Sequence, residues 1–101
     1  MNFQEALLEL KNGNHVARKG WNGKGMFLFY ISGRTIPFDK FMEFKNGNSL
    51  AIEKAVSLGL HNPGDEVVIG GHIDMKAADG SIVVGWLASQ TDMQADDWEI
   101  V

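Results

Sequence analysis

Two polar clusters in this sequence hold residue types that recognise nucleotides, and the first is the glycine-rich stretch at 20–25, Gly-Trp-Asn-Gly-Lys-Gly. A tryptophan can stack on a base, an asparagine amide can hydrogen-bond a base edge or ribose, and a lysine can neutralise a phosphate. Trp21, Asn22 and Lys24 are therefore candidate ligand-binding residues. A tryptophan that plugs the core beside a solvated lysine explains the stretch equally well. The spacing is not that of a phosphate loop, GxxxxGK[ST].

The second cluster is a run of four hydrogen-bonding residues near the C-terminal end, namely Ser89, Gln90, Thr91 and Asp92. Such a run is typical of a helix start, with a serine or threonine as the N-cap. It also suits one wall of a polar pocket, because the N-terminus of a helix attracts anions. The two interpretations are compatible with each other.

Residues for catalysis or metal binding do not form a recognisable pattern. The histidines are spread over three segments, as His15, His61 and His72, and the chain has no cysteine. No GxSxG or HExxH motif occurs. An acidic group near the C-terminus offers paired carboxylates for glycosidic or phosphodiester chemistry. It comprises Asp92, Asp96, Asp97 and Glu99. A solvated face that includes a helix cap is the ordinary role of such residues, so we predict no catalytic residue, metal or cofactor.

Composition narrows the class of protein further. The chain has 101 residues, 45% of them hydrophobic, and a net charge of −4. That size supports one domain with a modest core, for which oligomerisation is a common way to bury more surface. An acidic chain is a poor binder of DNA or RNA, whereas a small phosphorylated ligand needs only a few donors. With neither a basic, apolar leader nor a run of about 20 apolar residues, we expect no membrane association and a cytoplasmic location.

The elements that must position these clusters begin with an N-terminal helix. Apolar residues at 3, 6, 7 and 10 follow helical spacing, and Asn2 with Glu5 forms a capping-box pattern, so a helix is predicted over 2–11. A short strand over 15–18 then leads into the glycine-rich loop. The apolar, aromatic run 26–31 predicts a central strand that is buried on both faces.

The rest of the chain predicts further strands and short helices. We expect a turn over 32–37, a short helix or loop at 38–44, and a helix over 49–60. Strands are expected over 66–69, 72–77 and 82–86, the last two joined by an Asp-Gly turn, with one or two helical turns in 89–97 and an edge strand over 98–101. The predicted class is α+β: a small antiparallel sheet with an N-terminal helix and one or two further helices packed on it.

Three blocks of this sequence resemble the Thoeris anti-defence two-like family, long catalogued as a domain of unknown function and found mainly in phages. The blocks are residues 3–28, 73–83 and 85–101, and the most specific motifs are GWNGK and WLASQTDMQADDW. Residues 32–71 match least, so 1–101 is taken as one ligand-binding domain with a variable insertion at about 32–71. Family members often have proline before the Trp-Leu pair, where this chain has Val84-Gly85.

The resemblance implies a phage sponge that acts in the cytoplasm of the bacterial host. Members of the family sequester glycocyclic ADP-ribose, the immune signal of Thoeris, without cleaving it, so that the effector is never activated. Some are also thought to bind cyclic dinucleotides. The family implies a homo-oligomer, typically a tetramer, with ligand sites at the subunit interfaces.

Residue by residue, the resemblance implies that Trp21 and Phe3 stack on adenine. It also implies that Asn22 and Lys24 contact ribose or phosphate, that residues 89–92 bond hydroxyls and phosphates, and that Arg18 contacts a phosphate. Trp86 and Trp98 would belong to the core or an interface. Two rivals remain: an enzyme that degrades the nucleotide with the C-terminal acids, and a structural or protein-binding module anchored by tryptophans.

Overall fold

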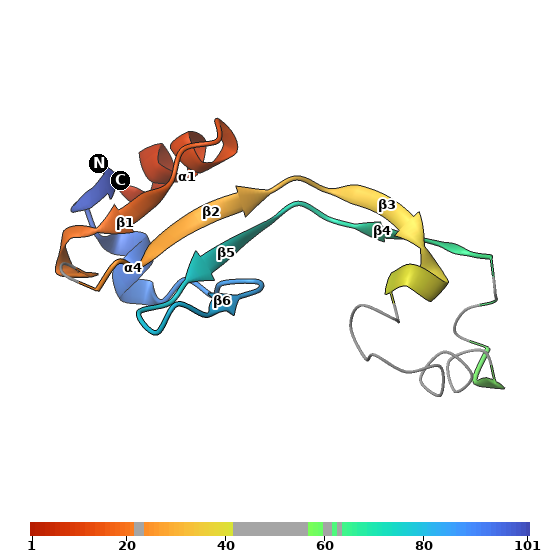
Figure 1. The fold of residues 1–101 in the computed structure, drawn as a ribbon. Coiled ribbons are helices and arrows are strands. Elements are labelled where there is room, and N and C mark those ends of the chain that lie inside the picture. The colour runs from red at the N-terminus through yellow and green to blue at the C-terminus, as the bar shows by residue number, and fades with distance from the viewer. Residues whose placement is uncertain (22–23, 42–56, 60–61, 63) are drawn as a thin grey trace. The chain divides into compact units, whose positions relative to one another are not determined.

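The computed structural model of this chain describes residues 1–21, 24–41, 57–59, 62 and 64–101 (Figure 1). The chain divides into two compact units, one formed by Met1–Ser32 with Gly71–Val101 and the other by Gly33–Gly70. The second unit spans nearly the same residues as the predicted insertion. The predicted α+β class is confirmed, with antiparallel strands and an N-terminal helix.

The first unit is built on a five-stranded antiparallel sheet in the order β6-β5-β2-β1-β7. Its strands are β1 (Val16–Arg18), β2 (Phe27–Ile31), β5 (His72–Lys76), β6 (Ile82–Val83) and β7 (Trp98–Ile100). β2 is the middle strand, as predicted, but it is not buried on both faces. Only Leu28 of β2 is buried, because the helix α1 covers the face of Leu28 while Phe27 and Phe29 on the opposite face stay partly exposed.

Helix α1 (Phe3–Lys11) begins and ends where its sequence predicts. The Asn2 side chain accepts a hydrogen bond from the Glu5 amide at 2.9 Å, and the Glu5 carboxylate accepts one from the Asn2 amide at 3.0 Å. This capping box satisfies two amides that the helix leaves without partners. The inner face of α1 packs on the sheet, and its buried residues form a core with those of the strands: Ala6, Leu10, Val16, Leu28 and Trp98.

The C-terminal part of the first unit crosses from one edge of the sheet to the other. The Asp79-Gly80 turn joins β5 to β6 as predicted, but β6 covers 82–83 rather than 82–86. The strand ends early because Gly85 adopts a positive φ of 76°. Helix α4 (Gln90–Gln94) follows, and β7 then forms the opposite edge, as predicted.

The second unit contains a two-stranded antiparallel sheet of β3 (Arg34–Pro37) and β4 (Glu66–Ile69). The prediction of β4 is confirmed, whereas the turn predicted over 32–37 is wrong. Pro37 is compatible with a strand here because it lies at the end of β3, opposite Glu66. Residues 38–41 are helical and Phe38 is buried. The helix predicted over 49–60 falls mostly outside the described residues. Across the described residues, no helix is long and apolar enough to cross a bilayer.

Candidate functional site

Four aromatic rings from distant parts of the chain meet on the α1 face of the sheet. Phe3 lies 5.5 Å from Trp98 and 6.2 Å from Trp86, between ring centroids. Trp21 meets the same two tryptophans edge-on, at 5.4 Å from Trp98 and 6.5 Å from Trp86. Edge-to-face contacts in this range are favourable for aromatic pairs. Trp98 is buried, which confirms it as a core residue, while Trp21 and Trp86 remain partly exposed.

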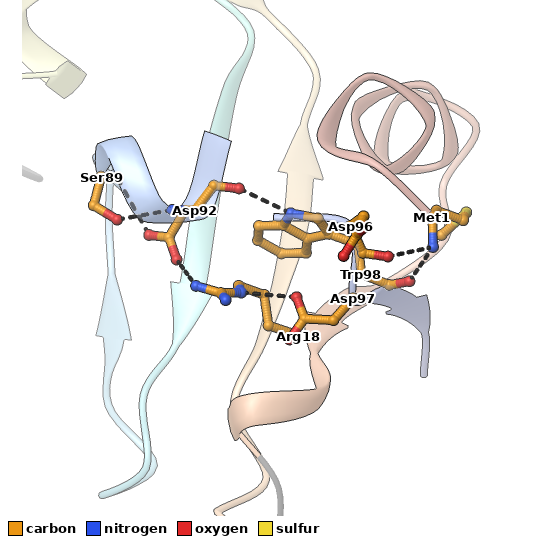
Figure 2. Close-up of polar contacts among 7 residues, drawn as sticks. All are labelled: Met1, Arg18, Ser89, Asp92, Asp96, Asp97 and Trp98. Atoms are coloured by element: carbon orange, nitrogen blue, oxygen red, sulfur yellow. Dashed lines mark hydrogen bonds and ion pairs between the residues drawn. The ribbon is translucent and has the colours of Figure 1, made fainter. Parts of the chain in front are cut away.

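Arg18 of β1 binds the C-terminal segment through two carboxylates (Figure 2). Its Nη1 lies 2.9 Å from Oδ1 of Asp92, and its Nε lies 3.0 Å from Oδ1 of Asp97. The Trp98 indole nitrogen donates to the backbone oxygen of Asp92 at 3.0 Å. Strand β1 is thereby fastened to α4 and to the residues before β7.

The charges of Arg18, Asp92 and Asp97 stabilise one another. Burial alone would raise the pKa of Asp92, but hydrogen bonds from Arg18 and Ser89 and the charge of Arg18 bring that pKa below its usual value. The hydrogen bond from Arg18 is the main cause of the lowered pKa of Asp97. The pKa of Arg18 is raised, first by Asp97 and then by Asp92. All three groups are therefore ionised at neutral pH.

Helix α4 begins with a reciprocal cap. The Ser89 hydroxyl accepts from the Asp92 amide at 3.0 Å, and Oδ2 of Asp92 accepts from the Ser89 amide at 3.2 Å. Both carboxylate oxygens of Asp92 are thus engaged, one by Arg18 and one by the cap. The structure gives Ser89 and Asp92 the role of fixing α4, which confirms the helix-start interpretation of this run.

An open hollow of about 370 Å³ lies beside α4. Its lining residues are Arg18, Gln90, Thr91, Gln94 and Ala95. Gln90 and Thr91 are exposed there, and the Gln90 side chain accepts only a long bond of 3.3 Å from Gln94. The hollow therefore presents amide and hydroxyl groups together with one edge of a guanidinium.

A second open hollow, of about 420 Å³, is lined from β1, β2, β5 and β7 and the loop that contains Trp21. Its charged and titratable side chains are those of His15, Arg18, Lys76 and Glu99. His15 stacks on Phe27 at 4.6 Å, and the Lys76 ammonium lies 5.5 Å from the centre of the same ring. The remaining lining residues are Ala17, Trp21, Gly25, Met26 and Val101.

Comparison with known proteins decides the family. The model of the Thoeris anti-defense 2-like domain matches residues 1–101, the whole chain. A curated relative named Thoeris anti-defense 2, from Bacillus phage SP01, is 41% identical over 101 residues, covering all of this chain and 94% of its own length. The chain belongs to the Thoeris anti-defense 2-like family. Membership assigns it to phage anti-defence, as its resemblance implied.

The structure distributes the predicted ligand residues of this Thoeris anti-defense 2-like chain over several places. Arg18 lines both hollows, Trp21 lines the larger one, and Gln90 and Thr91 line the smaller one. Phe3 lies in the aromatic cluster and lines neither. Lys24 is exposed and lines neither hollow, and Asn22 is outside the described residues.

The sequence did not indicate that Asp97 pairs with Arg18, or that His15 and Lys76 line a hollow. Period-two alternation in β5 places Lys76 on the same face as Asp74, and the register sets Lys76 directly opposite Phe27. The alternation of β5 was visible in the sequence, but the residues that lie opposite those of β5 on the neighbouring strand were not.

Within the described part of this Thoeris anti-defense 2-like chain, no three histidine or acidic side chains gather as metal ligands. Two of the four acidic residues considered for chemistry, Asp92 and Asp97, are bound to Arg18 with lowered pKa values. A carboxylate held in this way is a weak general base at neutral pH. Nothing in the described residues points to catalysis.

Proposed function

We propose that this protein is a phage sponge that binds glycocyclic ADP-ribose and holds it without cleavage in the host cytoplasm. Cyclic dinucleotides form a second ligand class that the same protein would take. The observation that supports this proposal is the family match over the full length of the chain, together with 41% identity to Thoeris anti-defense 2 of Bacillus phage SP01. Sequestration keeps the signal from its effector.

Trp21 is the residue best placed to stack on an adenine. It is fixed edge-on by Trp86 and Trp98 but remains partly exposed where it lines the larger hollow. A base stacked on an aromatic side chain gains about 1–3 kcal/mol. Lys76 in the same hollow offers a cation for a phosphate.

Gln90 and Thr91 are the residues best placed to bond ribose hydroxyls. They line the smaller hollow with exposed side chains, and Arg18 links the two hollows. Arg18 already donates to Asp92 and Asp97, so its contribution to a phosphate would come from its remaining N–H groups. In this proposal, Ser89 and Asp92 hold α4 in place rather than bind the ligand.

The proposed sponge is a homo-oligomer, as a tetramer or another closed assembly. Both hollows are open to solvent on one chain, and a ligand is enclosed most readily when a second copy forms the missing wall. The outer edge of β6 offers a surface for that copy. Ile82, Val83 and Val84 are exposed there, and residues 80–91 include no charged residue.

A calorimetric titration of the purified protein with glycocyclic ADP-ribose tests the proposal. We expect a dissociation constant of about 100 nM or lower, near −10 kcal/mol, because a sponge must keep the free signal scarce. The complex is then denatured by heat and the released ligand analysed by chromatography.

Intact ligand would support sequestration, whereas a cleaved product would identify a nucleotide-degrading enzyme. Failure to bind glycocyclic ADP-ribose, linear ADP-ribose and cyclic dinucleotides would favour a protein-binding module.

A further inference from the structure

We propose that Asp74 is a positioning residue whose carboxylate holds a one-residue bulge before Trp86 and so places Trp86 against Trp21. The inference concerns the path of the chain between β6 and α4. For ligand binding it rests on the proposed function, because Trp21 is the proposed stacking residue.

The register between β5 and β6 changes by one residue within a short distance. Ile82 pairs with Lys76, and Val83 pairs with Met75. Continued without interruption, this antiparallel register would set Trp86 opposite His72. Instead the Trp86 amide donates to the backbone oxygen of Ile73 at 2.7 Å. One extra residue is therefore accommodated, so that Val84 and Gly85 together oppose Asp74, as in a β-bulge.

That single residue decides on which face of the sheet Trp86 lies. Ile73 and Met75 share the face of Leu28, where α1 packs, whereas His72 and Asp74 lie on the opposite face. A shift of one residue moves a side chain from one face to the other. With the bulge, Trp86 joins the aromatic cluster of Phe3, Trp21 and Trp98; without it, the ring would point away from that cluster.

Asp74 supplies the hydrogen bond that the bulge removes from the ladder. The Gly85 amide donates to Oδ1 of Asp74 at 2.9 Å, and Gly85 takes a positive φ of 76°, a conformation in which glycine is favoured. Asp74 is 5% exposed and is the only buried charged residue among those the structure describes. His72 Nε2 lies 3.5 Å from the same Asp74 oxygen. The Gly85 amide, at 2.9 Å, is therefore the closer partner of that oxygen.

The consequence for binding follows from the edge-on contact between Trp86 and Trp21. Trp86 packs edge-on against Trp21, which also lines the larger hollow. Losing one aromatic neighbour would free the Trp21 ring to turn, so a ligand would have to order it on binding. The affinity would fall by about tenfold, which corresponds to the interaction energy of one aromatic pair.

The experiment compares full-length Asp74→Ala and Asp74→Asn with the wild type. The first readout, without ligand, is the circular dichroism band that arises from coupling between neighbouring tryptophans. The second is calorimetric titration with glycocyclic ADP-ribose. We expect Asp74→Ala to lose the part of the band that comes from the two Trp86 pairs, while the Trp21–Trp98 pair remains, and to lose about tenfold in affinity. We expect Asp74→Asn to keep the full band and the affinity, because the amide oxygen can accept the same bond from Gly85. Asp79→Ala, in the exposed turn of the same hairpin, is the matched control and should change neither.

An unchanged tryptophan band in Asp74→Ala would overturn the inference, as would an Asp74→Asn variant that fails as fully as the alanine. If Asp74→Ala does not fold, Gly85→Ala decides, with Gly80→Ala as a control of similar φ strain in the same hairpin. A folded Gly85→Ala that keeps the full band would contradict the bulge. This partial loss of the band in Asp74→Ala combined with no binding by the wild type would support the bulge and reject only the proposed ligand.

Discussion

At the scale of single residues, the position of Trp21 is compatible with both interpretations of its sequence context, a core residue and a stacking residue. Trp21 packs edge-on against Trp86 and Trp98, as a core residue does, yet it also lines the larger hollow. A ring held by its neighbours loses little freedom when a base stacks on it, which favours binding.

Substitution of Trp21 tests the stacking interpretation directly. We expect Trp21→Leu to weaken binding of glycocyclic ADP-ribose by about 10- to 100-fold, because one base–aromatic stack is lost. Trp21→Phe keeps an aromatic face and should lose less. Calorimetry at constant salt measures both, and Leu8→Ala, at an exposed position on α1, is the control. Equal affinities for Trp21→Leu and the wild type would exclude Trp21 as the stacking residue.

Ser89 and Thr91 lie two residues apart in different settings, Ser89 as the N-cap of α4 and Thr91 in the lining of the smaller hollow. Ser89→Ala removes the N-cap of α4 and should lower the free energy of unfolding by about 1 kcal/mol. Thr91 is exposed in the smaller hollow, so Thr91→Ala should change stability by less than about 0.5 kcal/mol while weakening ligand binding. Urea denaturation and calorimetry on both variants separate the effects. A destabilised Thr91→Ala with normal affinity would reverse the assignment.

At the scale of elements, the Arg18 clamp fastens β1 at two points to a C-terminal segment that is far away in sequence. It joins β1 to α4 and to the residue before β7 through two carboxylates whose pKa values are lowered. Stability from such carboxylates is present above their unfolded pKa, near about 4, and is lost as the pH falls through their lower folded values.

The clamp therefore predicts a pH-dependent effect of Arg18→Gln. The wild type should exceed the variant in stability by the largest margin at about pH 7, and the margin should shrink towards about pH 3 as Asp92 and Asp97 are protonated. Urea denaturation at both pH values gives the margin. Lys24→Gln, an exposed cation in the loop after Trp21, should show no such pH-dependent difference. A margin for Arg18→Gln that stays constant with pH would contradict the ionic role of the clamp.

Gly71 lies where the chain re-enters the first unit before β5, and Tyr30 of β2 packs directly over it. A Cβ at Gly71 would lie 2.0 Å from the Tyr30 hydroxyl oxygen and 2.8 Å from Cζ. We expect Gly71→Ala to cost about 1–3 kcal/mol of stability through overpacking. In a Tyr30→Leu background the same substitution should cost much less, which thermal or urea unfolding of the double-mutant cycle will measure. Additive costs would show that the ring is not the obstacle.

The elements were predictable where local chemistry specifies them. The capping box of Asn2 and Glu5 and the spacing of Ala6 and Leu10 specify α1, and the Asp79-Gly80 turn specifies the β5–β6 hairpin. β3 was missed because it is four residues long, follows Gly33 and ends at Pro37. The early end of β6 could not be foreseen, because it depends on a buried carboxylate of the neighbouring strand.

At the scale of the whole molecule, the two edges of the five-stranded sheet differ. The outer edge of β7 is paired at Trp98: the Trp98 amide donates to the Met1 oxygen at 3.1 Å, and the Met1 amine donates to the Trp98 oxygen at 2.7 Å (Figure 2). The edge strand β6 has exposed apolar residues and no charge. Charged residues normally protect such an edge from pairing with another chain.

This contrast predicts that β6 is a contact surface for a second copy. A twofold axis would pair the strand with its own copy and bring like charges of the two strands close together, a repulsion that an uncharged strand avoids. Val83→Lys should therefore reduce the assembly to a smaller species in light scattering coupled to size exclusion. Leu8→Lys, which adds the same charge at an exposed leucine of α1, should leave the mass unchanged. A monomeric wild type at micromolar concentration would refute the contact.

The residue types of the candidate site were predictable from the sequence, but the way these residues meet in space was not. The stacking tryptophan and the polar run were visible because their residue types are unusual beside glycines and apolar neighbours. The clamp by Asp97, and the meeting of His15 and Lys76 around Phe27, depend on pairings between distant strands. Local patterns do not specify those pairings.

The paired ends of β2 and β5 also bear on how such a chain can diversify. Ile31 and His72 lie directly opposite each other in the ladder, and the whole segment Gly33–Gly70 leaves and returns between them. Two adjacent, antiparallel strand ends can be closed by a hairpin of two residues or by a segment of almost any length, since loop closure costs grow slowly with length. The sheet thus offers a graft point at which lineages can gain, lose or exchange a module while the register of the five strands stays the same.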